Sequence, residues 1–213
     1  MNTQALKLYL VTDTPSTKGR DVEGIVLEAV KGGVTMVQLR EKNLDTGSFV
    51  RRAVRLKALL APFGVPLIIN DRVDVALASG ADGVHIGQSD MAYEDARRLL
   101  GSGSIIGLSV ENMEQVRAAN ALDVDYIGVS PVFPTHTKTD TAQPFGLEGL
   151  RQAVRISRHP AVAIGGMNAL TAKEAAACGA AGIAVVSAIM GAQDPHAAAV
   201  ELLKTIENEY RGI

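Results

Sequence analysis

The stretch Ile68–Asp90, IINDRVDVALASGADGVHIGQSD, decides the fold. An apolar run rich in β-branched residues, 66–69, predicts a buried strand, and a second apolar run follows at 83–86. Between them, residues 72–79 have helical composition and stop at Gly80, a common helix terminator. A strand, a crossover helix and a second strand predict two parallel strands that face the same way.

Two carboxylates follow these strands, Asp71 after the first and Asp90 after the second. If the strands are neighbours, about 4.8 Å apart, the carboxylates repel each other unless they share a proton or a cation. Oxygen ligands on a rigid frame favour Mg²⁺, with waters and substrate phosphates completing its coordination. Asp71 and Asp90 are therefore predicted metal ligands. The alternative is that both are loop carboxylates or helix caps.

Strand-like and helix-like segments alternate along the rest of the chain. The predicted strands are 7–11, 36–39, 66–69, 83–86, 105–110, 126–129, 161–164 and 183–186. The predicted helices are 22–31, 49–60, 72–79, 93–100, 113–122, 147–156, 171–178 and 197–209. Eight strand–helix units are the minimum for a (β/α)₈ TIM barrel, which we predict as a single α/β domain over residues 1–213.

A repeat along the sequence favours the closed barrel. Similar short turns lead into the even-numbered strands, at 32–34, 80–83, 123–125 and 179–182, whereas proline precedes two of the odd-numbered ones. A two-unit period repeated four times suits a closed eight-stranded barrel. The alternative, an open doubly wound sheet, has no reason to show this period.

Composition narrows the class of protein. The 213 residues are 47% hydrophobic but only 4% aromatic, so the core must be built from aliphatic side chains. A net charge of −2 with well-mixed charges gives no footprint for nucleic acid or a membrane. Cys178, the single cysteine, excludes an intrachain disulfide framework and is predicted to be a packing residue. With no leader-like segment and no apolar run near 18 residues, we expect a soluble cytoplasmic protein.

The second predicted strand ends in alternating polar residues. Side chains alternate faces along a strand, so Val37 and Leu39 point together toward the outer helices. Gln38, Arg40 and Lys42 then point into the barrel mouth. Two inward cations are costly unless an anion meets them, which suggests a bound phosphate. The alternative is pairing with a protein carboxylate, either Asp71 or Glu41.

A second anion site is predicted after strands seven and eight. Loops at these positions of a barrel often bind phosphate through backbone N–H groups. Gly165 and Gly166 suit this role because a missing Cβ lets the backbone approach a ligand closely. Val185–Ser187 ends the eighth strand beside them.

The longest connection, 130–146, follows strand six, and barrel loops of this length often bind ligands. Its Thr135, Thr137 and Lys138 offer hydroxyls and a cation to a phosphate. Ser109, at the end of strand five, faces the same mouth. His85, in mid-strand, is predicted to be a buried histidine with satisfied hydrogen bonds rather than a catalytic one.

Taken together, these motifs resemble a known family. They are Gln38–Lys42, Asn70–Asp71, Gly87–Asp90, Ser109, Pro134–Lys138, Gly165–Gly166 and Val186–Ser187. This set, in chain order along nearly the whole sequence, closely resembles the thiamine-phosphate synthase family. Each motif is weak by itself, but the combination is specific.

The resemblance implies a (β/α)₈ barrel that joins a hydroxymethylpyrimidine pyrophosphate to a thiazole phosphate and releases pyrophosphate. It also implies that Asp71 and Asp90 bind Mg²⁺. The implied ligands of the pyrimidine pyrophosphate are Gln38, Leu39, Arg40, Glu41, Lys42, Asn70, Ser109 and Lys138, of which Arg40, Lys42, Ser109 and Lys138 would have catalytic roles. The implied ligands of the thiazole phosphate are Thr135, His136, Thr137, Gly166, Val186 and Ser187.

Two other functions stay open. A related thiazole tautomerase typically carries a catalytic histidine directly after the Ser-Val pair of strand five, whereas Glu111 follows Ser109-Val110 here. A non-catalytic barrel that binds a phosphorylated metabolite is the other alternative. Small-molecule substrates are the expected partners, and the sequence leaves the oligomeric state open, a homo-oligomer included.

Overall fold

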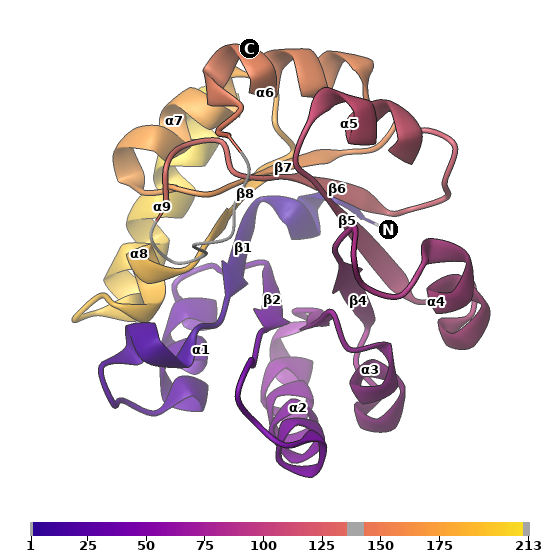
Figure 1. Ribbon diagram of the computed structural model, residues 1–213. Helices are drawn as coiled ribbons and strands as arrows, with labels where there is room; N and C mark the ends of the chain where they lie inside the picture. The colour runs from indigo at the N-terminus through magenta and orange to yellow at the C-terminus, as the bar shows by residue number, and fades with distance from the viewer. Residues whose placement is uncertain (1, 136–142, 211–213) are drawn as a thin grey trace.

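The computed structural model describes residues 2–135 and 143–210, which form a closed barrel of eight parallel strands (Figure 1). Each strand pairs with the next, and β8 pairs with β1 to close the sheet. The strands are β1 (Leu8–Val11), β2 (Met36–Leu39), β3 (Leu67–Asn70), β4 (Gly83–Ile86), β5 (Ile105–Val110), β6 (Tyr126–Val129), β7 (Ala161–Ile164) and β8 (Gly182–Val185). The predicted (β/α)₈ barrel is confirmed, and the open sheet is excluded.

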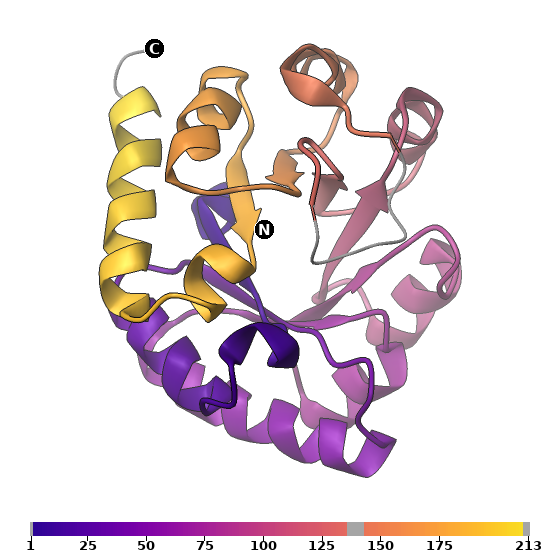
Figure 2. The same cartoon turned by 60° about the vertical axis from the view of Figure 1, so that its left-hand side comes forward.

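Helices surround the barrel on its outside. They are α1 (Val22–Lys31), α2 (Thr46–Leu60), α3 (Val73–Ser79), α4 (Tyr93–Leu100), α5 (Met113–Ala119), α6 (Gly146–Ile156), α7 (Ala169–Ala177), α8 (Ser187–Met190) and α9 (Pro195–Tyr210), with short 3₁₀ helices at Thr3–Leu6, Thr14–Thr17 and Ala61–Phe63. The last helix, α9, packs against both α7 and α1 and so completes the ring, as Figures 1 and 2 show. The predicted order of strands and helices is therefore confirmed.

Some predicted boundaries were wrong. Helix α2 begins at Thr46, not at residue 49, because the Asp45 carboxylate accepts a hydrogen bond from the Ser48 N–H and caps the first turn. Helix α5 ends at Ala119, not at residue 122. The four-residue helix α8 was not predicted, because so short an apolar segment carries no helical period.

The barrel has two apolar layers. Val37 and Leu39 are fully buried in the layer between the strands and the outer helices, as the alternation along β2 predicts. Inside the barrel a smaller cluster contains Tyr9, Ile68 and Tyr126. Two of the four tyrosines of the chain thus lie inside the barrel, in a cluster whose other buried members are aliphatic side chains and Met36.

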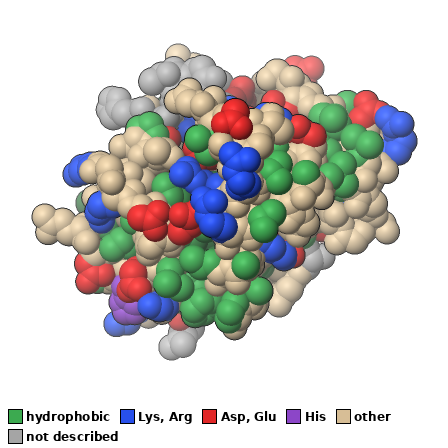
Figure 3. Space-filling view, turned by 90° about the horizontal axis from the view of Figure 1, so that it is seen from below, with side chains coloured by type: hydrophobic (Ala, Val, Ile, Leu, Met, Phe, Trp, Pro, Cys, Tyr) green, Lys and Arg blue, Asp and Glu red, His purple; other side chains and the backbone are tan. Residues whose placement is uncertain are grey.

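The outer surface has no large patch of one charge on the side formed by α1–α3. Figure 3 shows basic and acidic side chains interspersed there, and Arg55 of α2 pairs with Glu23 of α1 at 2.8 Å. Among the described residues, no helix is long and apolar enough to cross a membrane. Cys178 is buried, and its thiol lies 3.6 Å from the Leu147 carbonyl oxygen, in keeping with a packing role.

Candidate active site at the barrel mouth

The two predicted metal ligands meet at the carboxyl ends of β3 and β4, which are neighbours in the sheet. The Asp71 N–H donates to the His85 carbonyl oxygen at 2.8 Å, which fixes the turn after β3, and Asp71 adopts a left-handed φ of 62°. The Asp90 carboxylate accepts the Gly87 N–H at 2.7 Å. These backbone contacts bring the Asp71 and Asp90 carboxyl groups within hydrogen-bonding reach of each other.

The two carboxyl groups have opposite pKa shifts. Burial alone would raise the pKa of Asp71, but hydrogen bonds from Lys42 and Asp90 and the charge of Lys42 outweigh it, so this pKa lies below its ordinary value. Burial raises the pKa of Asp90, and the hydrogen bond and charge of Asp71 add to the effect against the opposing Gly87 hydrogen bond. The two carboxyl groups therefore lie close enough to affect each other's pKa.

A protein cation also lies beside this pair. The Lys42 ammonium donates to an Asp71 carboxylate oxygen at 2.8 Å, while the Lys42 side chain stays 53% exposed. Pairing with Asp71 was one of the alternatives that the sequence left open, and it is present. Since exposed ion pairs contribute little to stability, Lys42 can leave Asp71 at low cost.

Arg40 is likewise paired. Its Nη1 donates to Asp13, just after β1, at 3.1 Å, and both side chains are largely buried. Asp13 was not among the partner carboxylates considered from the sequence, which were Asp71 and Glu41. Asp13 was missed because its partner lies on another strand, although its place directly after a predicted strand is the same signal that identified Asp71.

Two of the implied residues of β2 and its loop direct their side chains elsewhere. Leu39 is fully buried in the outer layer, so only its backbone can face the mouth. The Glu41 carboxylate pairs with Arg52 of α2 at 2.5 Å and accepts from the Thr14 hydroxyl at 3.2 Å. Asn70, in contrast, ends β3 directly beside Asp71 and is partly exposed.

Below the mouth, Gln38 and Ser109 belong to one buried set of hydrogen bonds. The Gln38 amide donates to the Tyr9 hydroxyl at 2.7 Å, and the Ser109 hydroxyl lies 2.8 Å from His85 Nε2. His85 is only 4% exposed, which confirms the predicted buried histidine with satisfied hydrogen bonds. Tyr9 was missed, because its hydroxyl partners come from other strands.

On another side of the barrel, β7 and β8 are neighbours in the sheet, and Gly166, Val186 and Ser187 follow their carboxyl ends. Gly166 has a left-handed φ of 68°, and a Cβ there would lie 2.7 Å from the Phe133 Cβ. The glycine is thus required by its own backbone and by the preceding loop, in addition to any ligand. Ser187 is exposed as the first residue of α8.

Arg20 fixes the other end of α8. It donates to the Met190 carbonyl oxygen at 2.7 Å and to the Ala192 carbonyl oxygen at 2.6 Å.

Of the predicted loop ligands, Thr135 is described and partly buried. His136, Thr137 and Lys138 lie outside the described residues.

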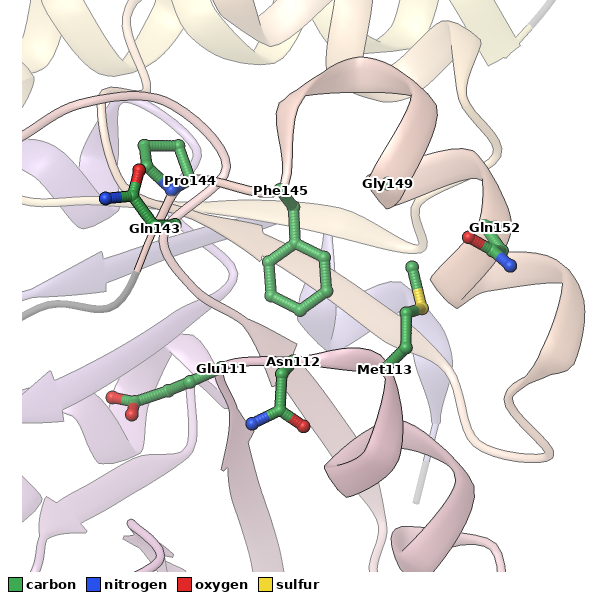
Figure 4. Close-up of a pocket in the computed structure, with 8 residues that line it drawn as sticks. All are labelled: Glu111, Asn112, Met113, Gln143, Pro144, Phe145, Gly149 and Gln152. Carbon is green, nitrogen blue, oxygen red and sulfur yellow. The ribbon is translucent and has the colours of Figure 1, made fainter.

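A hollow of about 430 Å³ lies beside these groups, between the segment after β5 and the start of α6. Figure 4 shows the Phe145 ring pointing from the start of α6 toward Asn112 and Met113. The hollow has one charged lining residue, Glu111. Because a carboxylate repels an anion, the hollow does not suit a phosphate. The carboxylates and cations of the mouth remain the better candidate site.

Comparison with known proteins matches nearly the whole chain to one sequence family. Residues 8–189 match the family described as thiamine monophosphate synthase. The thiamine-phosphate synthase of Albidiferax ferrireducens is 57% identical, with 96% of this chain and 93% of that protein covered. That of Vibrio campbellii is 51% identical, with 93% and 97% covered.

A solved structure agrees. The thiamine phosphate pyrophosphorylase of Pyrococcus furiosus superposes with a TM-score of 0.89 at 40% identity, covering 97% of this chain and 98% of its own. Such identity over such coverage extends beyond the barrel fold, which unrelated functions share. The chain therefore belongs to the thiamine-phosphate synthase family.

Proposed function

We propose that this protein joins a hydroxymethylpyrimidine pyrophosphate to a thiazole phosphate, with Mg²⁺ held between Asp71 and Asp90. Family membership along residues 8–189 is the observation that carries the proposal. The products are thiamine phosphate and pyrophosphate, so the enzyme is a transferase acting on two small phosphorylated molecules.

The carboxylate pair fits a magnesium ion. Asp71 and Asp90 are held by backbone contacts and lie close enough to need a shared positive charge. Among the described residues, no group of three or more His, Cys, Asp or Glu side chains is placed to hold a metal. A pair of carboxylates suits Mg²⁺, because this ion is usually bound by one or two carboxylates together with waters and substrate phosphates. When bound, the ion supplies positive charge to a departing pyrophosphate.

Arg40 and Lys42 would hold the pyrophosphate itself. Asp13 accepts from Nη1 alone of the Arg40 guanidinium, which has five N–H donors in total, so donors remain for a phosphate. Lys42 would turn from Asp71 to the phosphate oxygens. By the family resemblance, Lys138 adds a third cation, and Gly166, Val186 and Ser187 hold the thiazole phosphate.

With these groups in place, catalysis consists of positioning and electrostatics. The bond between the pyrimidine methylene carbon and the pyrophosphate oxygen breaks, and its electron pair leaves with the pyrophosphate. The electron-rich aminopyrimidine stabilises the resulting carbocation. The thiazole nitrogen, fixed by its phosphate, then donates its lone pair to form the new carbon–nitrogen bond, so no protein nucleophile is needed.

The test is incubation of the purified protein with both substrates and Mg²⁺, with thiamine phosphate and pyrophosphate measured together. Equal amounts of the two products are expected, and none with either substrate alone. Excess EDTA should abolish the reaction, and Mn²⁺ should restore it in part. Failure to form thiamine phosphate would refute the proposed function, and full activity in EDTA would refute the metal site.

A further inference from the structure

A continuous chain of hydrogen bonds crosses the interior of the barrel beneath the mouth. It runs from Gln38 Nε2 to the Tyr9 hydroxyl at 2.7 Å, and from there to the Tyr126 hydroxyl at 2.8 Å. The Tyr126 hydroxyl lies 3.0 Å from His85 Nδ1, and His85 Nε2 lies 2.8 Å from the Ser109 hydroxyl oxygen. The chain thus joins the end of β2 to β5 on the far side of the barrel.

The members of this chain other than Ser109, which is half-buried at its end, are enclosed. Tyr9 and Tyr126 are fully buried, and Gln38 and His85 are 3% and 4% exposed. Space for them depends on Gly107, because a Cβ there would fall on the Tyr126 ring and on His85 Nδ1. With the groups this deeply buried, each hydroxyl proton needs an acceptor within the protein.

Counting protons from the Gln38 end sets the direction of every bond. An amide NH₂ group only donates, so Tyr9 accepts from Gln38 and must give its own proton to Tyr126. Burial raises the pKa of both phenols above the ordinary value, so each keeps its proton. Tyr126 then donates to His85 Nδ1.

A neutral imidazole that accepts at Nδ1 carries its proton on Nε2. His85 Nε2–H therefore donates to the Ser109 oxygen. If His85 were doubly protonated, Nδ1 would donate to Tyr126, whose proton would turn to Tyr9. The Tyr9 hydroxyl would then accept from both Gln38 and Tyr126, and its own proton would have no acceptor in this series of hydrogen bonds. Neutral His85 with the proton on Nε2 is the state in which the protons of Tyr9, Tyr126 and His85 all have an acceptor in this set of hydrogen bonds, and only the proton of Ser109, at the mouth, points out of it.

We propose that Tyr126 and His85 are positioning residues that make Ser109 a hydrogen-bond donor toward the barrel mouth, where an acceptor atom of the pyrimidine pyrophosphate lies. Ser109 accepts from His85, so its own proton is available to a ligand. Its carbonyl oxygen accepts from Gln88 Nε2 at 2.6 Å, which also fixes the residue from the solvent side. The identity of the ligand rests on the proposed function, whereas the direction of the chain does not.

The first test needs no substrate. In the intact protein labelled with ¹⁵N-histidine, NMR correlation of the ring nitrogens with the ring protons distinguishes the two neutral tautomers and the imidazolium. At neutral pH we expect His85 to be neutral with its proton on Nε2. The opposite tautomer would mean that the chain runs in reverse and that Ser109 donates to His85, and it would overturn the proposal, as would an imidazolium.

The second test removes one link. Tyr126→Phe deletes the donor to Nδ1 while keeping the ring, so His85 can change tautomer and Ser109 can turn its proton inward. We expect the KM for the pyrimidine pyrophosphate to rise about tenfold, with the KM for the thiazole phosphate unchanged. Tyr210→Phe is the matched control, because that hydroxyl donates to the Ala180 carbonyl oxygen outside the barrel.

A conservative replacement separates positioning from mere packing. His85→Gln can place an N–H donor near Ser109, and His85→Ala cannot. We expect the glutamine variant to keep several-fold more of its pyrimidine kcat/KM than the alanine variant. Equal losses in both, or an unchanged KM in a folded Tyr126→Phe, would contradict the inference even if wild-type protein makes thiamine phosphate.

Discussion

Arg40 is the side chain on which we expect the proposed pyrophosphate site to depend most, because its guanidinium is held by Asp13 and keeps donors for a phosphate. Arg40→Ala should lower kcat/KM for the pyrimidine pyrophosphate about 100-fold, on the order of 3 kcal/mol for a charge-assisted contact in an enclosed site. Asp13→Asn should have a smaller effect, since the guanidinium stays but loses its orienting charge. Steady-state kinetics with the thiazole phosphate saturating measures both.

The control for these variants is Arg55→Ala, which removes an ion pair with Glu23 between the outer helices α1 and α2. It should leave kcat/KM unchanged. An Arg40→Ala protein with wild-type kinetics would show that the Arg40–Asp13 pair is purely structural.

The carboxylate pair makes a separate prediction at the residue scale. Asp90→Asn removes a ligand charge, so the Mg²⁺ concentration for half-maximal activity should rise and kcat should fall, and Asp71→Asn should act in the same direction. Binding supplies a second readout. Mg²⁺ with pyrophosphate should raise the melting temperature of the wild type more than that of either variant. Equal stabilisation of all three proteins would contradict a metal site at these residues.

At this scale the sequence predicted positions better than contacts. Asp71 and Asp90 follow from the rule that parallel strands end at one edge. The partner of Arg40, however, lies 27 positions away, in the segment after β1, and no local pattern marks the pair. The Tyr9–Tyr126 bond joins residues 117 positions apart, so it too depends on the closure of the barrel.

At the scale of elements, the β7 and β8 ends predict different outcomes for two substitutions. Ser187→Ala should raise the KM for the thiazole phosphate several-fold without changing the melting temperature, because Ser187 is exposed at the first position of α8. Gly166→Ala should instead destabilise the fold by about 1–3 kcal/mol, since its φ is 68° and a Cβ would lie 3.0 Å from the Pro134 carbonyl oxygen.

Thermal unfolding with and without inorganic phosphate, together with kinetics, separates the two effects. A normal KM for the thiazole phosphate in Ser187→Ala would remove this serine from the site. Because substitution of Gly166 should itself destabilise the fold, a variant at this position is a poor probe of ligand binding. The sequence alone predicted only its role in binding a ligand.

Element boundaries show where local patterns stop being informative. The apolar runs of the strands were located to within one residue at most ends, because buried parallel strands are continuously apolar. The start of α2 was missed by three residues, although Asp45 and Ser48 form an N-terminal capping pattern that the sequence displays. Helix α8 has too few residues for any period, and it is defined by tertiary contacts.

For the whole molecule, Arg20 joins the first loop of the barrel to the last. Its guanidinium contacts carbonyl oxygens of Thr17, Met190 and Ala192. Arg20→Met should lower stability by about 2–3 kcal/mol, because three carbonyls lose a charged donor. That corresponds to roughly 5–10 °C in melting temperature for a chain of this size.

The matched control is Arg55→Met, because the Arg55 side chain is 58% exposed and pairs with a single carboxylate, that of Glu23. It should shift the melting temperature by little, as surface ion pairs do. Equal shifts in the two proteins would show that the Arg20 contacts do not hold the barrel loops together.

The global architecture was the most predictable level. Alternation of eight strands and helices, with a period of two units, leaves few arrangements other than a closed barrel, and the family motifs add a second constraint. Both depend on order along the chain, which the sequence contains. The ion pairs of Lys42 with Asp71 and of Glu41 with Arg52 depend on side-chain rotamers, which cannot be predicted from the order of strands and helices.

The series of hydrogen bonds from Gln38 to Ser109 has two possible directions. No single bond can reverse alone, because a buried proton would then have no acceptor. A group at the Gln38 end that accepted instead of donating would reverse both phenols and the imidazole together. Ser109 would then offer a lone pair where it had offered a proton. Whether Ser109 on β5 offers a proton or a lone pair to a ligand is thus set by whether residue 38 on β2 donates or accepts. A substitution at residue 38 should therefore change the hydrogen-bonding role of Ser109.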